Sequence, residues 1–324
     1  MPTYIYKCNE CGTKFEKFHK VKEILEDIIC PNCNSSSAKM KIRKISINAF
    51  ILFMLIAILS CDVIDPPYLK ENNHTEDTNS KRKILLEDYT GFRCPNCPEA
   101  QRLAEQLKET YKDRLILMAV HAGYYAKPQG SLYTYDFRTN VGNELDKFFG
   151  NSTAGNPNGM VNRATFLGSK ILYPDQWENG IISFLDQKPK ILISLKSILN
   201  QATRELNVTV EMKFLEQGKS NYHLAIYITE DSIVNYQTDK NANPPDVKDY
   251  VHNHVLRESL NGAWGDQIST DDIPQNTVIR KIYNYTIPSE KDWRYNKLNI
   301  IAYIHDKGDT YEILQVEEQP IELK

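Results

Sequence analysis

The sequence predicts a multi-domain protein in which an α/β domain is followed by an all-β domain. A small cysteine-rich unit and a short apolar segment precede both. Three observations support this organisation. Six of the seven cysteines fall into three Cys-x-x-Cys pairs. The seventh ends the apolar run, and the hydrophobic period changes from helical to alternating after Pro189.

The composition already excludes several classes of protein. At about 100–200 residues per domain, 324 residues predict two or three domains. The chain is 41% hydrophobic and 10% aromatic with a net charge of −3, which excludes global disorder. Balanced charge argues against nucleic acid as a partner held by phosphate neutralisation alone. A single apolar run excludes a polytopic membrane protein.

The first two cysteine pairs predict a zinc site. Cys8 and Cys11 are separated by 18 residues from Cys30 and Cys33, a spacing typical of four-cysteine sites. Four thiolates complete a tetrahedron and leave no open position for catalysis. The metal would supply folding energy that so short a segment lacks. Two disulfides, or chance pairs, are the alternatives.

The sequence around these cysteines resembles a known small family. Residues 1–8 (MPTYIYKC) and 11–16 (CGTKFE) are similar to the FmdB-type zinc ribbon, whose regulatory role is poorly defined. The resemblance covers about residues 1–39. It implies a zinc-stabilised hairpin and no catalysis.

Residues 40–60 predict a lipoprotein signal peptide. Three cations lie in residues 40–44, an eleven-residue apolar run covers 49–59, and Ser60 precedes Cys61. The run is shorter than the roughly 20 residues of a spanning helix. The cysteine resembles that of the bacterial lipobox, which implies acylation of Cys61 and a lipid anchor in the membrane. An uncleaved anchor and a buried helix are the alternatives.

The order of these segments is unusual, because a signal peptide normally begins a chain. Met40 would be a natural start, so residues 1–39 are expected to come from a fusion or a miscalled start. If translated, the ribbon would stay cytosolic while the chain after Cys61 is exported. Residues 61–82 are polar and contain two adjacent prolines, which predicts a flexible tether.

Residues 83–188 predict a thioredoxin-like domain with an insertion. An apolar strand at 84–90, the pair Cys94 and Cys97, helical spacing at 99–111 and a second strand at 115–120 form a βαβ pattern. The amino terminus of a helix stabilises a thiolate, so Cys94 is the predicted nucleophile and the more exposed cysteine. Cys97 would be the resolving thiol.

Two more residues are candidates for the same site. Asp88 resembles the buried acid of thioredoxins that manages the proton of the second cysteine. Pro157 resembles the cis-proline that faces the cysteine pair in that fold. The pair is equally consistent with a structural disulfide, since exposure and pKa decide reactivity. Metal binding by this pair alone lacks ligands.

Other residues near this site have two interpretations. His121 either packs or takes part in the chemistry. His252 and His254, at i and i+2, would share one strand face and either bind a metal or pack. A group of aromatic side chains forms a substrate groove or, more commonly, part of the core: Tyr124, Tyr125, Tyr133, Tyr135 and Phe137.

Residues 189–324 predict an Ig-like β-sandwich. Apolar and polar residues alternate in short runs between turn-rich joints, at 191–196, 206–214, 224–228, 278–282 and 298–304. A sandwich by itself fixes no function, and nothing in these runs resembles a catalytic motif.

Several segments resemble the outer-membrane-protein-twenty-eight-related lipoproteins of Bacteroidetes-type bacteria. The matching segments are 86–98 (LEDYTGFRCPNCP), 121–123 (HAG), 157–163 (PNGMVNR) and 250–257 (YVHNHVLR). The resemblance extends over about residues 40–324. It implies a surface or outer-membrane lipoprotein with a thioredoxin-like domain and a β domain, without a settled reaction.

We therefore expect an exported cell-envelope lipoprotein, at the outer membrane, that serves binding or assembly. Thiol–disulfide exchange by Cys94 and Cys97 would be an added activity. Its expected partners are the membrane, through the anchor on Cys61, and envelope proteins or thiol substrates. The alternatives are an envelope thiol–disulfide oxidoreductase and a cytosolic zinc-ribbon regulatory protein. Zinc, in the ribbon alone, is the expected cofactor.

Overall fold

The computed structural model describes residues 3–11, 13–18, 29–33, 35, 38–40 and 81–324. The chain divides into two compact units, Met1–Thr75 and Glu76–Lys324. Cys61, the predicted signal segment after Met40 and the predicted tether up to residue 80 lie outside the described residues. No helix among the described residues is both long enough and apolar enough to cross a membrane.

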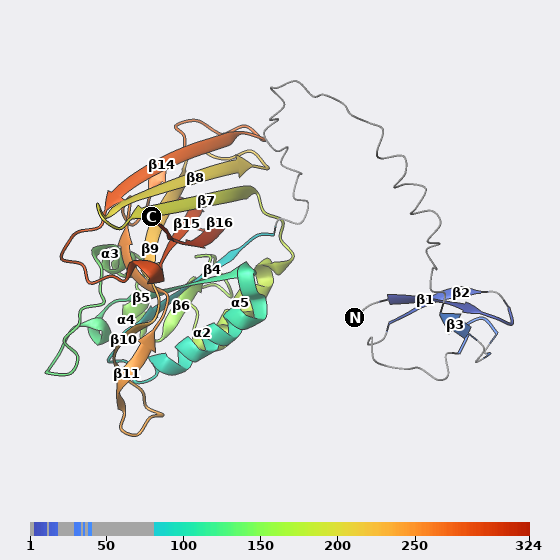
Figure 1. The fold of residues 1–324 in the computed structure, drawn as a ribbon, viewed down its shortest axis with the longest axis horizontal. Coiled ribbons are helices and arrows are strands. Elements are labelled where there is room, and N and C mark those ends of the chain that lie inside the picture. The colour runs from blue at the N-terminus through green and yellow to red at the C-terminus, as the bar shows by residue number, and fades with distance from the viewer. Residues whose placement is uncertain (1–2, 12, 19–28, 34, 36–37, 41–80) are drawn as a thin grey trace, which may run out of the picture. The chain divides into compact units, whose positions relative to one another are not determined.

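The amino-terminal unit contains a three-stranded antiparallel sheet in the order β2-β1-β3 (Figure 1). Its strands are β1 (Thr3–Cys8), β2 (Lys14–Phe18) and β3 (Ala38–Met40). β1 leads directly into the turn that holds the first cysteine pair. The hairpin that the ribbon resemblance implies is therefore present.

The larger unit is mostly β-structure with a few helices. Its main sheet has eight strands in the order β16-β15-β9-β12-β5-β4-β6, with β13 paired to β9. The bounds are β4 (Ile84–Thr90), β5 (Leu115–His121), β6 (Asn158–Val161), β9 (Tyr222–Glu230), β12 (Val255–Ser259), β13 (Asp266–Gln267), β15 (Leu298–Asp306) and β16 (Ile313–Pro320).

The first part of this sheet follows the predicted βαβ pattern. β4 and β5 are parallel and fully buried, which matches the almost continuous apolar sequence of β5 and the apolar start of β4, although Glu87 and Asp88 interrupt β4. They are connected by α2 (Cys97–Tyr111) and the short 3₁₀ helix η1 (Lys112–Arg114). After the second strand come η2 (Tyr124–Ala126), α3 (Asn140–Phe149), α4 (Asn151–Ala154) and α5 (Pro174–Leu185).

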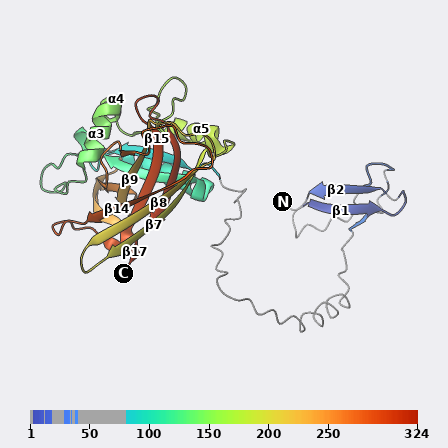
Figure 2. The ribbon, with the colours of Figure 1, turned by 90° about the horizontal axis from the view of Figure 1, so that it is seen from above.

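A second sheet has the order β14-β8-β7-β17 and packs against part of the first (Figure 2). Its strands are β7 (Ile191–Asn200), β8 (Glu205–Phe214), β14 (Val278–Thr286) and β17 (Glu322–Leu323), with η3 (Tyr295–Lys297) before β15. Alternate residues of β8 are buried, as the alternating sequence predicts. The core between the sheets joins β7 and β8 to β9 and β15.

The eight-stranded sheet also joins the two segments that the sequence predicts as separate domains. The boundary predicted at residues 188 and 189 falls between α5 and β7. However, β12 pairs with β5 on one side and with β9 on the other, so the sheet continues across both segments. One apolar cluster on this sheet includes side chains of β4, β5, α3, β9 and β15. On the other face of β4 and β5, a second cluster packs α2 and α5 (Figure 1).

A buried ion pair connects these segments. Arg163 donates two hydrogen bonds to Glu87, at 2.8 and 2.7 Å, and neither side chain is exposed to solvent. The guanidinium also lies 5.2 Å from the ring centroid of Phe149, 5.0 Å from that of Tyr303 and 6.0 Å from that of Trp264. These aromatic residues come from α3, β15 and the loop before β13. The pair therefore holds together elements from both halves of the unit.

Removing one partner of this pair should be costly. Arg163→Met leaves the Glu87 carboxylate buried and unpaired, so the free energy of unfolding should fall by about 3–5 kcal/mol in chemical denaturation. Arg138→Met is the control, because Arg138 pairs with the partly exposed Asp136 and should cost less than about 1 kcal/mol. Equal losses in the two variants would contradict this interpretation.

Candidate functional site

Cys94 and Cys97 form a disulfide at the amino terminus of α2. Gly91 and Phe92 turn the chain out of β4, and the Cys94 N–H donates to the Gly91 carbonyl at 2.9 Å. The two cysteines are 1% and 0% exposed. Cys94, predicted to be the more exposed cysteine, exceeds Cys97 by only this margin, and both side chains are buried.

The disulfide is covered by a hairpin far along the chain, formed by β10 (Ile233–Thr238) and β11 (Asp246–His252). The buried Gln237 amide donates to the Cys94 carbonyl at 3.1 Å. The Thr238 N–H donates to the Phe92 carbonyl at 2.8 Å, and the Lys240 N–H donates to the Pro95 carbonyl at 3.0 Å. Three consecutive contacts thus run along the segment that carries the cysteines.

Side chains fasten the same hairpin to α2. Arg102 Nη1 lies 2.9 Å from Asp239 Oδ2, in the turn after β10. Lys240 Nζ lies 2.9 Å from Glu99 Oε2. The Tyr250 hydroxyl donates to Gln101 Oε1 at 2.5 Å. The first two turns of α2 are therefore bound to the hairpin that covers the disulfide.

Asp88 and Pro157 lie at the same end of the sheet as the disulfide. Asp88 is opposite Ala119 of β5 and Gly159 of β6. Tyr89 pairs with Asn158, which puts Pro157 beside the end of β4, and the Asn156–Pro157 peptide bond is cis. The structure thus brings the four predicted site residues to one end of β4. Their chemical role remains a prediction.

Burial dominates the electrostatics of Asp88. The residue is 5% exposed, and its Oδ1 atom has no hydrogen-bond partner. Desolvation raises the pKa of this carboxyl to about 7. Asp88 is therefore about half ionised near neutral pH. Its side chain is buried at the face of β4 that packs against α2.

The histidines separate into two environments. His121 stacks on Phe137 at a centroid distance of 4.6 Å, and His252 packs on the same ring at 4.7 Å. Burial lowers the pKa of His252 to about 4. His254 lies after the end of β11 with φ of 56° and approaches Glu105 and Asp231 instead. Because β11 ends at His252, His252 and His254 do not share a strand face. The metal site that would need both histidines on that face is therefore absent.

The aromatic residues of the insertion also divide. Tyr124 is 66% exposed, whereas Phe137 is 2% exposed and packs with Phe92. The Tyr133 hydroxyl lies 2.7 Å from the Thr238 hydroxyl, on the covering hairpin. Tyr133 and Phe137 therefore support the hairpin and the core, whereas Tyr124 lies at the surface.

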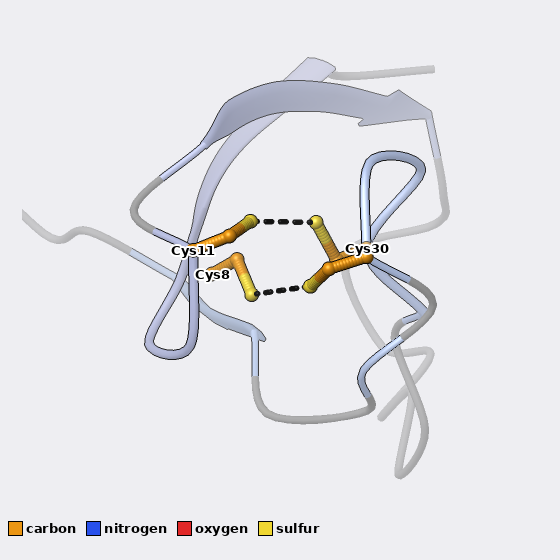
Figure 3. A group of neighbouring side chains, drawn as sticks. Cys8, Cys11 and Cys30 are labelled. Carbon is orange, nitrogen blue, oxygen red and sulfur yellow. Dashed lines mark hydrogen bonds between the residues drawn. The ribbon is translucent and has the colours of Figure 1, made fainter.

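The amino-terminal cysteines form a compact cluster (Figure 3). Their four sulfur atoms lie within 4.8 Å of one another, with Cys8 and Cys33 at 3.6 Å and Cys11 and Cys30 at 3.6 Å. All four are free cysteines, which argues against the alternative of two disulfides.

This cluster fits a metal ion. Tetrahedral zinc with Zn–S bonds of about 2.3 Å sets neighbouring sulfur atoms about 3.8 Å apart. The Thr13 hydroxyl, 3.2 Å from Cys11 Sγ, lowers the pKa of that thiol to about 6 and so favours its thiolate, whereas the pKa of Cys33, beside the other thiols, is raised. Cys8, Cys11, Cys30 and Cys33 would hold the ion as a closed structural site.

The sequence did not reveal two sets of residues: the buried ion pair of Glu87 and Arg163, and the hairpin residues that cover the disulfide. Glu87 and Asp88 interrupt an apolar strand, and that interruption was a signal for buried partners. Arg163 lies in a segment already singled out, but nothing in the sequence connects it to Glu87. No local pattern identifies Gln237 as a cover for Cys94.

These features define a class: a mixed α/β protein, mostly of β-sheet, with a covered disulfide and a separate four-cysteine cluster. A family model described as outer membrane protein Omp28 matches residues 143–324, and one described as a zinc ribbon domain matches residues 1–42. The first match spans more than half of the chain, and the chain belongs to the Omp28 family. No curated protein matches it.

One solved structure shows a similar fold. HBP35 of Porphyromonas gingivalis aligns with a TM-score of 0.54 at 17% identity, covering 74% of this chain and 76% of that one. A domain of the outer membrane lipoprotein Omp28 from the same organism is 20% identical, covers 42% of this chain and 91% of that one, and aligns with a TM-score of 0.28. At this identity the first likeness concerns the fold alone.

Asp88 should make stability depend on pH. Because its pKa is raised in the folded state, the folded chain holds a proton that the unfolded chain releases between about pH 4 and pH 7, and stability is lost across that window as pH rises. Asp88→Asn should therefore add up to about 4 kcal/mol at pH 8 and much less at pH 5 in urea unfolding. Asp113→Asn, at an exposed position, is the control. A pH-independent effect of Asp88→Asn would contradict the prediction.

The cysteine cluster should bind one zinc ion per chain. We expect Cys30→Ser to abolish stoichiometric zinc measured by mass spectrometry, because Cys30 is buried and supplies one of four thiolates. Unfolding of the unit Glu76–Lys324 should be unchanged by zinc removal. Stoichiometric zinc in the Cys30→Ser variant would show that the ion binds elsewhere.

Proposed function

We propose that the chain is an envelope lipoprotein, anchored at the outer membrane through acylated Cys61, whose larger unit binds partners rather than catalysing disulfide exchange. Membership of the Omp28 family supports an envelope location. The lipobox-like sequence before Cys61 supports the anchor. The larger unit would then lie outside the cytosol, in an oxidising compartment where a stable disulfide is favoured.

The observation that carries the proposal is the burial of the disulfide under the hairpin of β10 and β11. Exchange begins when a thiolate attacks a disulfide sulfur in line, and this requires access. Cys94 and Cys97 are 1% and 0% exposed, and Gln237 and Thr238 contact the loop that carries them. The arrangement supports a cross-link that fixes the start of α2.

The finer fold assignment is part of this proposal. A thioredoxin-like domain is supported by parallel β4 and β5 joined by α2, by the cysteine pair at the start of that helix, and by antiparallel β6 after Pro157. An Ig-like β-sandwich is supported by the two sheets that share one core across β7, β8, β9 and β15.

One observation favours a second function, envelope thiol–disulfide oxidoreductase. Asp88, with a pKa near 7, and Pro157 lie at the same end of β4 as the disulfide, which is the arrangement that the resemblance to thioredoxins implies. In that case Cys94 would be the nucleophile and Cys97 the resolving thiol, after the hairpin opens. Envelope proteins with thiols would be the substrates.

The experiment is the intact mass of the protein purified from its own cells and alkylated with and without prior reduction. The proposal expects a chain that begins at triacylated Cys61, with Cys94 and Cys97 blocked until strong reduction. A full-length, unacylated chain that carries zinc would instead support the cytosolic zinc-ribbon alternative. Reduction of native protein by mild dithiol at the rate of an exposed disulfide would support the oxidoreductase.

Weakening the hairpin should make the disulfide easier to reduce. Gln237→Ala removes the hydrogen bonds from Gln237 to Cys94 and Thr238, each worth about 0.5–1.5 kcal/mol. Because 1.4 kcal/mol is a factor of ten, the rate of reduction in native buffer should rise about tenfold. Val234→Ala, on the exposed side of the same hairpin, should leave the rate unchanged. Identical rates in all three proteins would mean that the hairpin does not control access.

A further inference from the structure

A cavity of about 440 Å³ lies between α2, the strands β4 and β5, and the end of β11. Asp88 and Leu117 of the sheet, Gln101 and Glu105 of α2, and Tyr250 and His254 of the hairpin side line it. The hairpin that covers the disulfide therefore forms one wall of a space that reaches the sheet.

Most polar groups of the wall already have partners in the protein. His254 Nε2 lies 3.3 Å from Glu105 Oε1, and its Nδ1 lies 3.4 Å from Asp231 Oδ1. The hydrogen bond from His254 lowers the pKa of Glu105, so this carboxylate is ionised but paired. Arg102, at the rim, pairs with Asp239 of the hairpin turn.

Asp88 differs from these charged groups because its carboxyl forms no ion pair, whereas Arg102, Glu105 and His254 each do. Its side chain lines the cavity, is 5% exposed, and leaves Oδ1 buried without a hydrogen-bond partner. The cavity wall also includes the apolar side chains of Leu117 and Ala104. A carboxyl held in this way is costly unless a donor or a cation approaches it. The cavity thus presents an unsatisfied acid above an apolar surface.

We propose that this cavity binds a primary alkylammonium group, with the ammonium on the Asp88 carboxylate and the alkyl chain against Leu117 and Ala104. This names a ligand class for the binding protein proposed above and rests on that proposal. A compact ammonium supplies three donors to one buried acceptor. An anion is disfavoured, because it would meet both Asp88 and Glu105.

The charges that face Asp88 predict how binding depends on pH. Arg102 and Glu105 come from α2, Tyr250 from β11, and His254 from the segment that follows. The pKa of Asp88 is about 7, so its carboxylate fraction rises about tenfold from pH 6 to pH 8 and apparent affinity should follow. Burial opposes protonation of His254, but Glu105 and Asp231 outweigh it and raise the pKa of this side chain. A positive charge on His254 at lower pH would repel the ammonium, so it acts in the same direction as protonation of Asp88.

The test is calorimetric titration of the full chain with n-hexylammonium chloride, n-hexanol and sodium hexanoate at pH 6 and pH 8. We expect saturable binding of hexylammonium alone, about tenfold tighter at pH 8. Asp88→Asn, which should fold at least as well as the parent, should weaken that binding at least about tenfold, since it removes a buried charge pair. Asp113→Asn should bind like the parent.

Three results would overturn the proposal: binding of hexanol as tight as that of hexylammonium, unchanged binding in Asp88→Asn, or no saturable amine binding at either pH. A parallel titration with N-acetyl-lysine methylamide distinguishes a protein lysine from a free amine as the source of the group. If the protein has an acylated Cys61 and a disulfide that resists reduction but does not bind the amine, only the proposed ligand is rejected. Amine binding in an unacylated chain rejects the proposed anchoring alone.

Discussion

The buried pair of Glu87 and Arg163 is the constraint on which the larger unit depends. Two charges inside a protein are tolerated when they are fully paired, and here the guanidinium makes two hydrogen bonds to one carboxylate. The aromatic rings around it come from α3, β15 and the loop before β13. The pair therefore ties β4 and the segment after β6 to later strands of the one sheet that both predicted domains share, in which β12 pairs with β5 and β9.

That shared sheet determines the surroundings of the cysteine pair. β12 inserts beside β5, and the chain just before it forms the hairpin of β10 and β11. The hairpin consequently lies over Cys94 and Cys97 and is tied to α2 by Asp239, Lys240 and Tyr250. The Cys-x-x-Cys motif, taken by itself, indicates redox chemistry, but in this fold it forms a buried disulfide. The same hairpin encloses the space beside Asp88, so covering the disulfide and forming a cavity are consequences of one packing arrangement.

Much of the fold could be predicted because its signals are local. β4, α2, β5 and α5 follow runs whose period or apolar content is visible in the sequence. The alternation of β8 likewise predicts a strand that buries one face against a second sheet, whereas β9 is buried on both faces. The assignment of His252 and His254 to one strand failed because the chain leaves β11 at His252, and a single residue with positive φ redirected the second side chain.

The sequence by itself determined which residues can carry chemistry: the four amino-terminal cysteines, the pair at Cys94 and Cys97, the acid at Asp88 and the proline at Pro157. Their type and spacing are local properties of the chain. Only the tertiary structure decided that the disulfide is covered and that Asp88 lacks a partner. The reason is physical: the contact between Gln237 and Cys94 spans 143 residues of sequence. Burial, and with it reactivity and pKa, is set by such distant contacts, which no local pattern encodes.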